Sequence, residues 1–323
     1  MSDIVQLGKK RPSVQLREFV VLSGKGGTGK TSLTAALIAA RSGVVAADCD
    51  VEAANLAVLF DRPDDKEVAF SSGRKASVNA DLCFGCGACM EVCRFDAMSM
   101  RSMELHIDSM ACEGCGACAV VCPVDAIEFH PVHAGHWAVR ALPSGGVLVH
   151  AELEPGEDRS GRLVSEVRTQ ARKSAEALAL STIIIDGPPG IGCPVHAALS
   201  GVQAAVLVTE PTRAAISDLD RVLSTAAHFR VPVGVVINKC DLAPEQAREV
   251  EALCDRRGVP VVGRVPFDRL IPEALGRGEV PSVACVSLAD TARQVWSCFD
   301  QPASLAIPRT SSAEPVSVGA GSS

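Results

Sequence analysis

The sequence contains no tyrosine, and aromatic residues make up only 3% of its 323 residues. Surfaces that stack nucleic-acid bases need such side chains, so the composition argues against base stacking. Basic residues are also in deficit, because 31 lysines and arginines face 38 aspartates and glutamates and give a net charge of −7. Neutralising the phosphates of a nucleic acid needs the opposite balance. We therefore expect no nucleic-acid partner.

Long apolar runs are missing as well, since none approaches the roughly 18 residues that a membrane-spanning helix needs. Residues 1–12 lack the apolar segment of a secretory signal. We therefore expect a cytoplasmic protein with no membrane partner. Hydrophobic residues reach 47% and charged residues 21%, which is typical of a globular protein with one large or two modest domains.

Short β-branched runs alternate with helical segments, as in parallel strands joined by crossover helices. Several strands are apolar at nearly every position, so both faces of the sheet should be covered. The sequence predicts an α/β fold with a doubly wound, mostly parallel sheet. The expected strands are 18–22, 43–47, 146–150, 182–186, 204–209, 233–238 and 260–265, and the expected helices are 30–41, 161–180, 214–229, 244–257 and 288–299. Residues 1–17 and 300–323 are expected to be flexible tails.

A glycine-rich loop between the first expected strand and helix matches the pattern G-x-x-x-x-G-K-[ST]. Its glycines let backbone N–H groups close around phosphate oxygens at a helix N-terminus. We expect Lys30 to reach the outer phosphates and the Thr31 hydroxyl to bind Mg²⁺. A glycine-rich turn that matches by chance is the alternative. The loop consists of Gly24, Lys25, Gly26, Gly27, Thr28, Gly29, Lys30 and Thr31.

Lys25 gives this loop the form K-G-G-x-G-K-T, which resembles the MinD/ParA group of P-loop ATPases. The resemblance implies a homodimer in which Lys25 reaches the nucleotide of the partner subunit. Asp48-Cys49-Asp50 resembles the family's D-x-D segment, which implies that Asp50 orients the attacking water; a simple turn aspartate is the alternative. The strand that ends at Asp186 resembles a Walker B strand, which implies that Asp186 holds Mg²⁺.

Another strand ends in Asn238-Lys239-Cys240-Asp241, which looks like the base-recognition element N-K-x-D. Asp241 would suit guanine, whereas the family contacts adenine through the asparagine. The resemblance therefore favours ATP over GTP, with Asn238 at the base.

The strand and helix periodicity fades from about 74 to 130, where cysteines crowd the sequence. The segment from Cys83 to Cys93 recurs from Cys112 to Cys122, with all four cysteines offset by 29 residues and 8 of 11 positions identical. We expect a small domain inserted at 74–130 between two parts of the ATPase domain, 18–73 and 131–299.

Each repeat reads Cys-x₂-Cys-x₂-Cys-x₃-Cys, the ligand run of bacterial [4Fe–4S] ferredoxins, in which the fourth cysteine ligates the other cluster. Zinc held by Cys-x₂-Cys pairs is the alternative. The insert resembles a two-cluster α+β ferredoxin, except that Arg94 stands where the second run has Pro123. One cluster is assigned to Cys83, Cys86, Cys89 and Cys122, and the other to Cys112, Cys115, Cys118 and Cys93.

Weaker signals lie outside these motifs. Cys193 follows the Walker B loop and is either a contact to a subunit or cluster in transit, or an inert thiol. His130, His133 and His136 recur every third residue and suit an exposed connector better than a metal site.

The nesting of one motif set inside the other resembles MinD-superfamily ATPases with an inserted ferredoxin domain. It predicts an ATP-hydrolysing dimer whose nucleotide state gates electron transfer from two [4Fe–4S] clusters to a redox or metallocofactor-maturing protein. An iron–sulfur cluster carrier or assembly scaffold is the alternative. A positioning ATPase that patterns a membrane or DNA is disfavoured by the acidic composition.

Overall fold

The computed structural model describes residues 15–60, 62–63, 67–155, 157 and 160–310. The outer parts of both expected tails, 1–14 and 311–323, lie outside these residues. The chain divides into two compact units. We call them the large unit, which comprises Met1–Val68, Trp137–Leu153 and Ser160–Ser323, and the insert unit, which comprises Ala69–His136 and Glu154–Arg159. No helix in the described part of the chain has the length and apolar character to span a bilayer.

A sheet with parallel pairing forms the centre of the large unit, and its strand order is β11-β10-β9-β1-β8-β2-β7. The order then continues through β6 and β3. The non-sequential order means that the strands are joined by crossovers, as the apolar runs predicted. The strands of the large unit are β1 (Arg17–Ser23), β2 (Val45–Asp48), β7 (Val147–Leu153), β8 (Thr182–Pro189), β9 (Ala204–Thr209), β10 (Val233–Asn238) and β11 (Val261–Val265).

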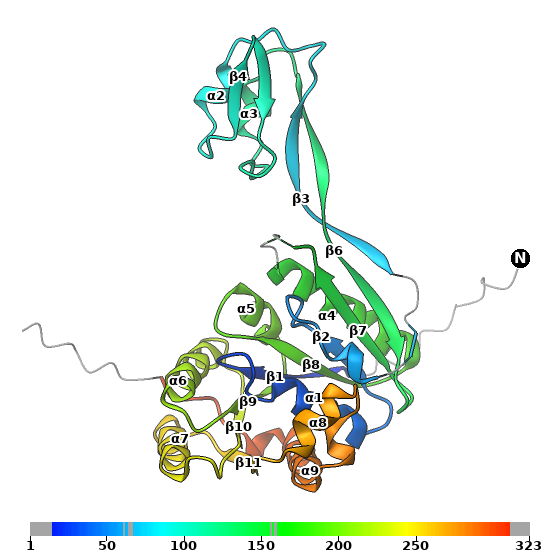
Figure 1. Ribbon diagram of the computed structural model, residues 1–323, viewed down its shortest axis with the longest axis vertical. Coiled ribbons are helices and arrows are strands. Elements are labelled where there is room, and N and C mark those ends of the chain that lie inside the picture. The colour runs from blue at the N-terminus through cyan, green and yellow to red at the C-terminus, as the bar shows by residue number, and fades with distance from the viewer. Residues whose placement is uncertain (1–14, 61, 64–66, 156, 158–159, 311–323) are drawn as a thin grey trace, which may run out of the picture. The chain divides into compact units, whose positions relative to one another are not determined.

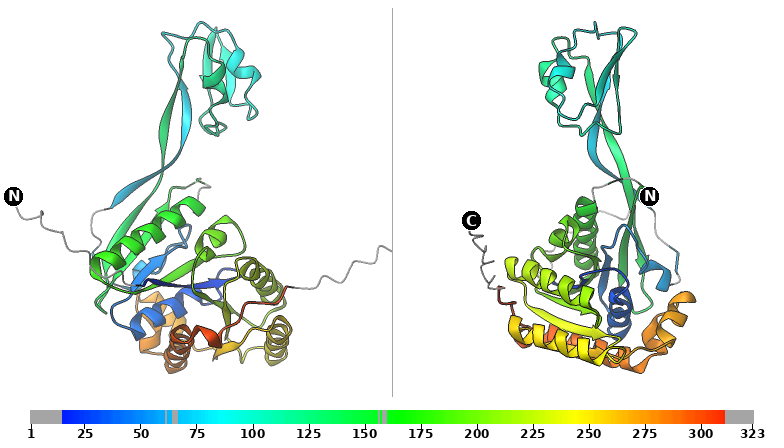
Figure 2. Two further views of the ribbon diagram at one scale, coloured as in Figure 1. Left: turned by 180° about the vertical axis from the view of Figure 1, so that it is seen from behind. Right: turned by 60° about the vertical axis from the view of Figure 1, so that its left-hand side comes forward.

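Helices cover both faces of this sheet (Figures 1 and 2). The ring of Phe19 in β1 stacks on Phe299 with 4.3 Å between centroids, and the indole N–H of Trp296 donates to the Leu37 carbonyl at 2.9 Å. These contacts fix the first and last helices on one face. Since other helices cover the opposite face, the doubly wound α/β architecture is confirmed. The helices are α1 (Lys30–Ala40), α4 (Ser160–Leu178), α5 (Cys193–Leu199), α6 (Arg213–His228), α7 (Pro244–Arg257), α8 (Leu270–Gly276) and α9 (Val286–Asp300), with 3₁₀ turns η1 (Ala57–Leu59), η2 (Pro281–Val283) and η3 (Pro302–Ser304).

The segment after α9 stays packed on the large unit as far as Arg309, although its composition suggested a tail from residue 300. Leu305 is buried, and Ala306 forms an antiparallel bridge with Val233 beside the sheet. The guanidinium of Arg257 donates to the Arg309 carbonyl at 2.7 Å. One apolar side chain and satisfied backbone groups therefore order a stretch that is otherwise rich in small and polar residues.

The insert unit is entered and left by two long strands, β3 (Val68–Val78) and β6 (Ile127–Ala141). Between them lie α2 (Ala88–Glu91), the antiparallel pair β4 (Met98–Arg101) and β5 (Glu104–Ile107), and α3 (Ala117–Val121). The sequence pattern did not predict β3 and β6. Buried and exposed residues do not alternate regularly along these two strands, so the two-residue pattern that indicates a half-buried strand is weak.

The two cysteine repeats adopt the same backbone conformation at corresponding positions. Gly85 and Gly114 have φ values of 75° and 60°, and Gly87 and Gly116 have values of 80° and 90°. The offset of 29 residues also relates Asp96 and Asp125, whose φ values are 50° and 52° although neither is glycine. The sequence repeat is therefore a structural repeat.

Candidate functional site

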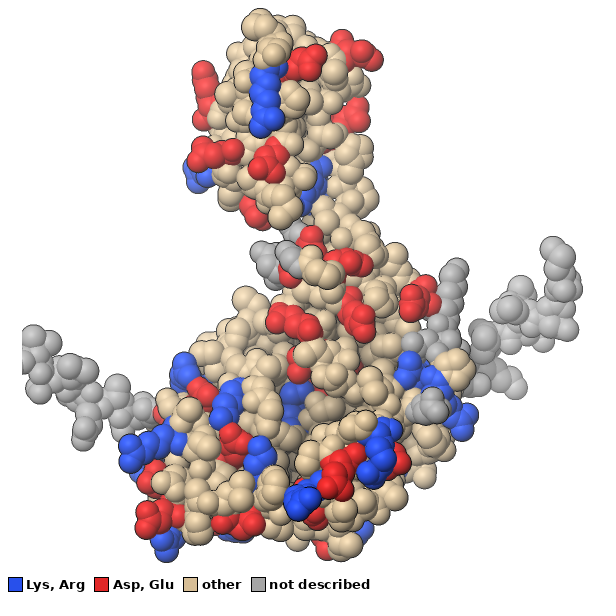
Figure 3. All heavy atoms as spheres, in the orientation of Figure 1, with Lys and Arg blue, Asp and Glu red and all other residues tan. Residues whose placement is uncertain are grey.

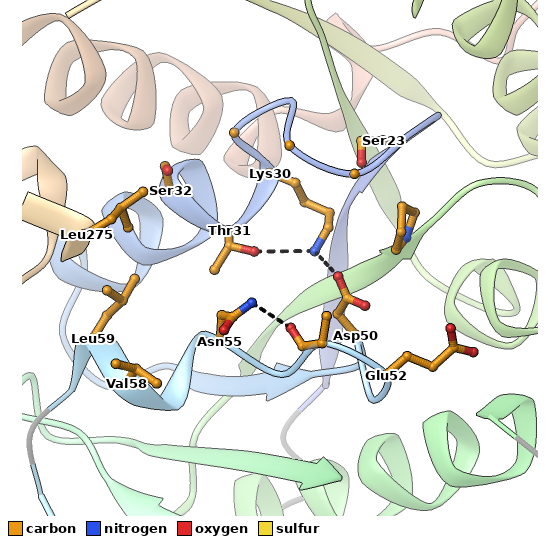
Figure 4. A pocket seen from close by; sticks show the side chains of 15 residues that line it. Ser23, Lys30, Thr31, Ser32, Asp50, Glu52, Asn55, Val58, Leu59 and Leu275 are labelled. Carbon is orange, nitrogen blue, oxygen red and sulfur yellow. Dashed lines mark hydrogen bonds and ion pairs between the residues drawn. The ribbon is translucent and has the colours of Figure 1, made fainter. Parts of the chain in front are cut away.

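The glycine-rich loop joins the end of β1 to the start of α1 and surrounds open space with backbone groups (Figure 4). Gly29 caps the helix with φ 96°, and a Cβ there would lie 2.3 Å from Nδ2 of Asn238. A Cβ on Gly24 would lie 2.4 Å from the Cβ of Asp218. Only glycine fits these positions, and the close packing holds the loop in the shape of a phosphate cradle.

Lys30 is buried at the bottom of the cradle, and its Nζ lies 3.1 Å from Oδ1 of Asp186 and 3.3 Å from Oδ2 of Asp50. Figure 4 shows the Lys30 and Asp50 side chains pointing toward each other. Burial alone would lower the pKa of Lys30, but the carboxylates of Asp186, Asp50 and Asp48 raise it. The ammonium group is therefore charged and positioned for the outer phosphates of a nucleotide.

Asp186, at the middle of β8, accepts hydrogen bonds from two hydroxyls of α1. Thr31 Oγ1 donates to one of its oxygens at 2.8 Å, and Thr34 Oγ1 donates to the other at 2.7 Å. The structure thus brings Thr31 and Asp186 together, as the magnesium prediction requires. A hydroxyl and a carboxylate are the oxygen ligands that Mg²⁺ takes beside nucleotide phosphates.

Asp48 is a functional residue to which the sequence analysis gave no role of its own. It is fully buried at the end of β2, and its two oxygens accept the N–H groups of Asp50 and Leu56, each at 3.1 Å. Burial and the nearby Asp186 raise its pKa to about 8. Asp48 therefore anchors both ends of the loop that carries Asp50 and Asn55. Its place at the end of an apolar strand was the available signal.

Lys25 lies apart from Lys30 and is paired within the chain. Its Nζ is 2.6 Å from Oε1 of Glu210, and Lys239 Nζ is 2.9 Å from the other oxygen. Burial would raise the pKa of Glu210, but the hydrogen bonds from both lysines lower it. One carboxylate after β9 thus holds two loops that border the phosphate cradle.

Asn238 and Asp241 both bind the protein's own backbone. The Asn238 amide donates to the Thr28 carbonyl at 2.8 Å, and Asp241 accepts the N–H of Phe267 at 2.6 Å. Asn238 therefore supports the phosphate loop directly, in addition to any contact with a base.

The cradle opens into a cavity of about 520 Å³, within the range of small-molecule sites. Lys30, Asp50 and Asn55 line it, as do Glu52 and Pro189. The arrangement combines anion-binding backbone, a buried cation and carboxylates that would hold a metal ion and a water. It is suited to binding and cleaving a nucleoside triphosphate.

The cysteines of the insert unit line two separate hollows. Apart from its four cysteines, each hollow has a largely apolar lining that includes Met100 and Leu105 in one and Phe95 and Phe129 in the other. Each contains the first three cysteines of one run and the last cysteine of the other run. The first hollow contains Cys83, Cys86, Cys89 and Cys122, and the second contains Cys112, Cys115, Cys118 and Cys93.

Three cysteines of these hollows, Cys89, Cys112 and Cys118, are buried, and two thiols accept hydrogen bonds from backbone N–H groups. Ala126 N–H donates to Cys122 Sγ at 3.2 Å, and Ala76 N–H donates to Cys112 Sγ at 3.5 Å. Burial raises the pKa of Cys89. Within the described residues, no three His, Cys, Asp or Glu side chains are close enough to share a single metal ion. The structure therefore does not draw the cysteines of either hollow together around a single ion.

The weaker candidates are scattered. Cys193 is exposed at the start of α5, and no described metal-binding group includes it. His130 Nε2 lies 2.7 Å from Ser77 Oγ, and His133 Nε2 lies 3.2 Å from Glu154. His136 also has an interaction partner. The structure therefore does not join the three histidines in one metal site.

Comparison with known proteins places this geometry in a family. Residues 19–282 match the model of the CobQ/CobB/MinD/ParA nucleotide binding domain. The uncharacterized protein MJ0578 of Methanocaldococcus jannaschii is 37% identical over 227 residues, which cover 69% of this chain and 78% of that protein. The iron-sulfur cluster carrier protein of Pyrococcus abyssi is 28% identical over 132 residues, 36% of this chain and 44% of that protein.

Solved structures agree with the fold. A ParA family ATPase from Chlorobium tepidum superposes with a TM-score of 0.51 at 17% identity, covering 86% of this chain and 98% of that one. Together with the family match and the complete phosphate loop, this gives the class of the protein. The chain belongs to the CobQ/CobB/MinD/ParA nucleotide-binding family and is an ATPase.

Proposed function

We propose that this ATPase binds two [4Fe–4S] clusters in a ferredoxin-like insert and uses its nucleotide state to gate electron transfer to a redox or metallocofactor-maturing protein. The observation that carries the proposal is the grouping of the cysteines. Each hollow draws three cysteines from one run and one from the other. Two-cluster ferredoxins have the same arrangement, because the fourth cysteine of each run ligates the other cluster. When bound, such clusters supply one-electron chemistry.

The hollows suit a cluster better than a zinc ion. A zinc ion holds its four sulfurs at about 2.3 Å and so brings them close together, whereas no three cysteines of the described chain are grouped this tightly. The largely apolar lining and the N–H donors to Cys112 and Cys122 are typical of an iron–sulfur environment.

ATP and Mg²⁺ would bind in the cradle of the large unit. Lys30 would neutralise the outer phosphates, Thr31 and Asp186 would hold the metal ion, and Asp50 would orient the attacking water. Asn238 would stiffen the loop and lie beside the adenine. In a homodimer, Lys25 would exchange its pairing with Glu210 for the partner's nucleotide.

A chemical link between nucleotide state and insert runs through η1. This turn follows Asp50 and Asn55 and precedes β3 in the chain. Arg140, on β6, donates to the Phe60 carbonyl at 3.2 Å and to the Ala57 carbonyl. Both strands that lead to the insert are therefore tied to the loop that senses the outer phosphate, one covalently and one through Arg140.

Delivery of clusters is a second candidate, favoured by similarity to the carrier protein of Pyrococcus abyssi. Each hollow, however, offers four cysteines from this chain, which is enough to satisfy every iron of a cube. A carrier needs a cluster that leaves easily. Resident clusters that pass electrons fit a full ligand set better than exchangeable cargo.

Anaerobic purification followed by iron and sulfide analysis tests the proposal. We expect about eight irons and eight sulfides per chain, as two [4Fe–4S] clusters require, and an EPR spectrum of the reduced protein that changes when ATP and Mg²⁺ are added. A preparation that holds zinc, or no metal, would overturn it. Iron-55 in the clusters should stay with the chain during turnover, whereas its transfer to an acceptor would favour the carrier.

A further inference from the structure

The surface of the insert unit contains a hollow that the nucleotide and cluster sites do not use. It lies beside Cys115 and is lined by the backbone or side chains of Glu91, Val92, Arg94 and Val120, among others. Its lining belongs entirely to the insert unit. Cys115 is exposed and also lines the second cysteine hollow. The surface hollow is therefore adjacent to the proposed cluster site at the point where a thiol of that site reaches the surface.

Apolar side chains are unusually exposed at this place. Val120, on the outside of α3, is 86% exposed, and Phe95 is 42% exposed. Val120 lines neither cysteine hollow, and both exposed side chains cost free energy in water. Aromatic and arginine side chains around an apolar centre are enriched where proteins bind one another.

Positive charge distinguishes this hollow from the rest of the insert unit. Residues 69–136 contain four lysines and arginines against eight aspartates and glutamates, and acidic side chains are spread over the face of the insert at the top of Figure 3. Two of the four basic residues, Arg74 and Arg94, line the hollow, while only one acidic residue, Glu91, does so.

Arg94 is the group that is free to bind a partner. The guanidinium of Arg74 already lies 4.2 Å from the Phe129 ring centroid and donates to the Gly114 carbonyl at 3.3 Å. Arg94 is exposed and has no hydrogen bond or ion pair with any other residue that the structure describes. It also stands where the second repeat has Pro123, so the two repeats differ here in charge.

We propose that this surface, formed by Arg94, Phe95, Val120 and Cys115, docks an electron-carrier protein with an acidic surface. The inference rests on the proposed function, and it adds the class of partner and the surface at which that partner would bind. The carrier would lose one electron as the cluster held by Cys115 gained one, with no bond or proton exchanged. Val120 and Phe95 would supply apolar contact, and Arg94 would pair with a carboxylate of the carrier.

Binding of an acidic plant-type [2Fe–2S] ferredoxin to the full-length chain tests the inference by anaerobic titration calorimetry. We expect the wild type to bind with a Kd below about 100 μM. Arg94→Glu should weaken binding at least about tenfold, because a like charge now faces the carrier. Val120→Ser should weaken it about three- to tenfold by removing apolar contact.

Arg101→Glu is the matched control, since it makes the same charge change on an exposed residue of β4 outside the hollow. It should alter Kd less than about threefold, because exposed charges at a distance are screened. Equal effects of the two arginine variants, binding that ignores Arg94→Glu, or no binding by the wild type would overturn the inference. So would a change of oligomeric state in Val120→Ser, because this face would then be a subunit interface.

Iron content of the same samples separates this inference from the proposed function. Arg94→Glu should keep the iron content of the wild type, since Arg94 lines neither cysteine hollow. Wild type without iron would refute the clusters, whatever the calorimetry shows. Wild type with about eight irons but no affinity for the ferredoxin would refute only the docking surface.

Discussion

Lys30 Nζ lies between Asp186 and Asp50, at 3.1 Å from a carboxylate oxygen of the first and 3.3 Å from one of the second. The lysine comes from the phosphate loop, Asp186 from the middle of β8, and Asp50 from the loop that follows β2. Because a nucleotide with Mg²⁺ would insert new charges among all three, we expect this cluster to rearrange when ATP binds. We expect the change to reach the loop that carries Asp50 and leads to η1.

Lys30→Ala should lower the rate of ATP hydrolysis about 10²- to 10³-fold, because a group that stabilises transition-state charge is lost. The iron content should stay unchanged, since the cysteine hollows lie in the other unit. Phosphate release and iron analysis on one preparation measure both. Wild-type hydrolysis in the variant would contradict the role of the loop.

Cys86→Ser should reduce the iron content from about eight to about four per chain, since serine removes one of four thiolates from a cluster. Cys193→Ser is the control, because Cys193 is also exposed but lies outside both hollows. Iron analysis and EPR of the reduced proteins distinguish them. An unchanged spectrum of Cys86→Ser would refute this ligand, and iron loss in Cys193→Ser would give that thiol a role we do not assign.

Asp48→Asn should loosen the loop from Asp50 to Leu56, because the amide N–H₂ cannot accept the second of the two backbone N–H groups that Asp48 holds. We expect kcat to fall about 10- to 100-fold, since a small misplacement of a positioning loop is costly. Faster hydrogen exchange at the Leu56 amide is the direct readout.

Asp241→Asn provides the comparison for Asp48. Asp241 also accepts a backbone N–H, from Phe267, but this contact lies after β11 and away from the loop. The Asp241→Asn variant should therefore leave hydrogen exchange at the Leu56 amide unchanged. If the Leu56 amide exchanges as slowly in Asp48→Asn as in the wild type, the Asp48 side chain does not anchor the loop.

The cradle and the cysteine runs were predictable from sequence because each is a local pattern whose spacing dictates its chemistry. Gly24 to Thr31 form one continuous loop at the start of α1, and each cysteine run folds within eleven residues. Glu210 was not predictable in its present role, since its partners Lys25 and Lys239 come from loops far away in the sequence. The partners of Asp48 are the backbone N–H groups of the loop that follows it, and a backbone contact leaves no mark in the sequence. The long strands β3 and β6 also escaped prediction, because no alternating apolar face marks them.

Glu210→Gln should make the large unit less stable near neutral pH, and the difference should vanish in acid. Lys25 and Lys239 lower the pKa of Glu210 below its ordinary value of 4.5. The native state thus binds fewer protons at this group than the unfolded state. The stabilisation is present above pH 4.5 and is lost as the pH falls through the lowered pKa.

Urea unfolding of the nucleotide-free proteins from pH 7 to pH 3, followed by tryptophan fluorescence, measures this difference. Glu279→Gln is the control, because Glu279 pairs with Arg277 at 2.9 Å on an exposed surface. Exposed pairs contribute little, so its unfolding should match the wild type. A difference for Glu210→Gln that persists unchanged at pH 3 would contradict the ionic pairing.

Gly114→Ala and Gly87→Ala separate backbone strain from steric clash in the insert unit. Both glycines have positive φ, 60° and 80°, so alanine costs about 1–2 kcal/mol at either. A Cβ at Gly87 would meet nothing within 4 Å, whereas one at Gly114 would lie 1.8 Å from the Arg74 carbonyl oxygen. The chain around Cys112 and Cys115 must therefore shift in Gly114→Ala alone. We expect this variant to lose iron from one cluster and Gly87→Ala to keep both; equal retention in the two variants would mean that β3 yields freely at Arg74.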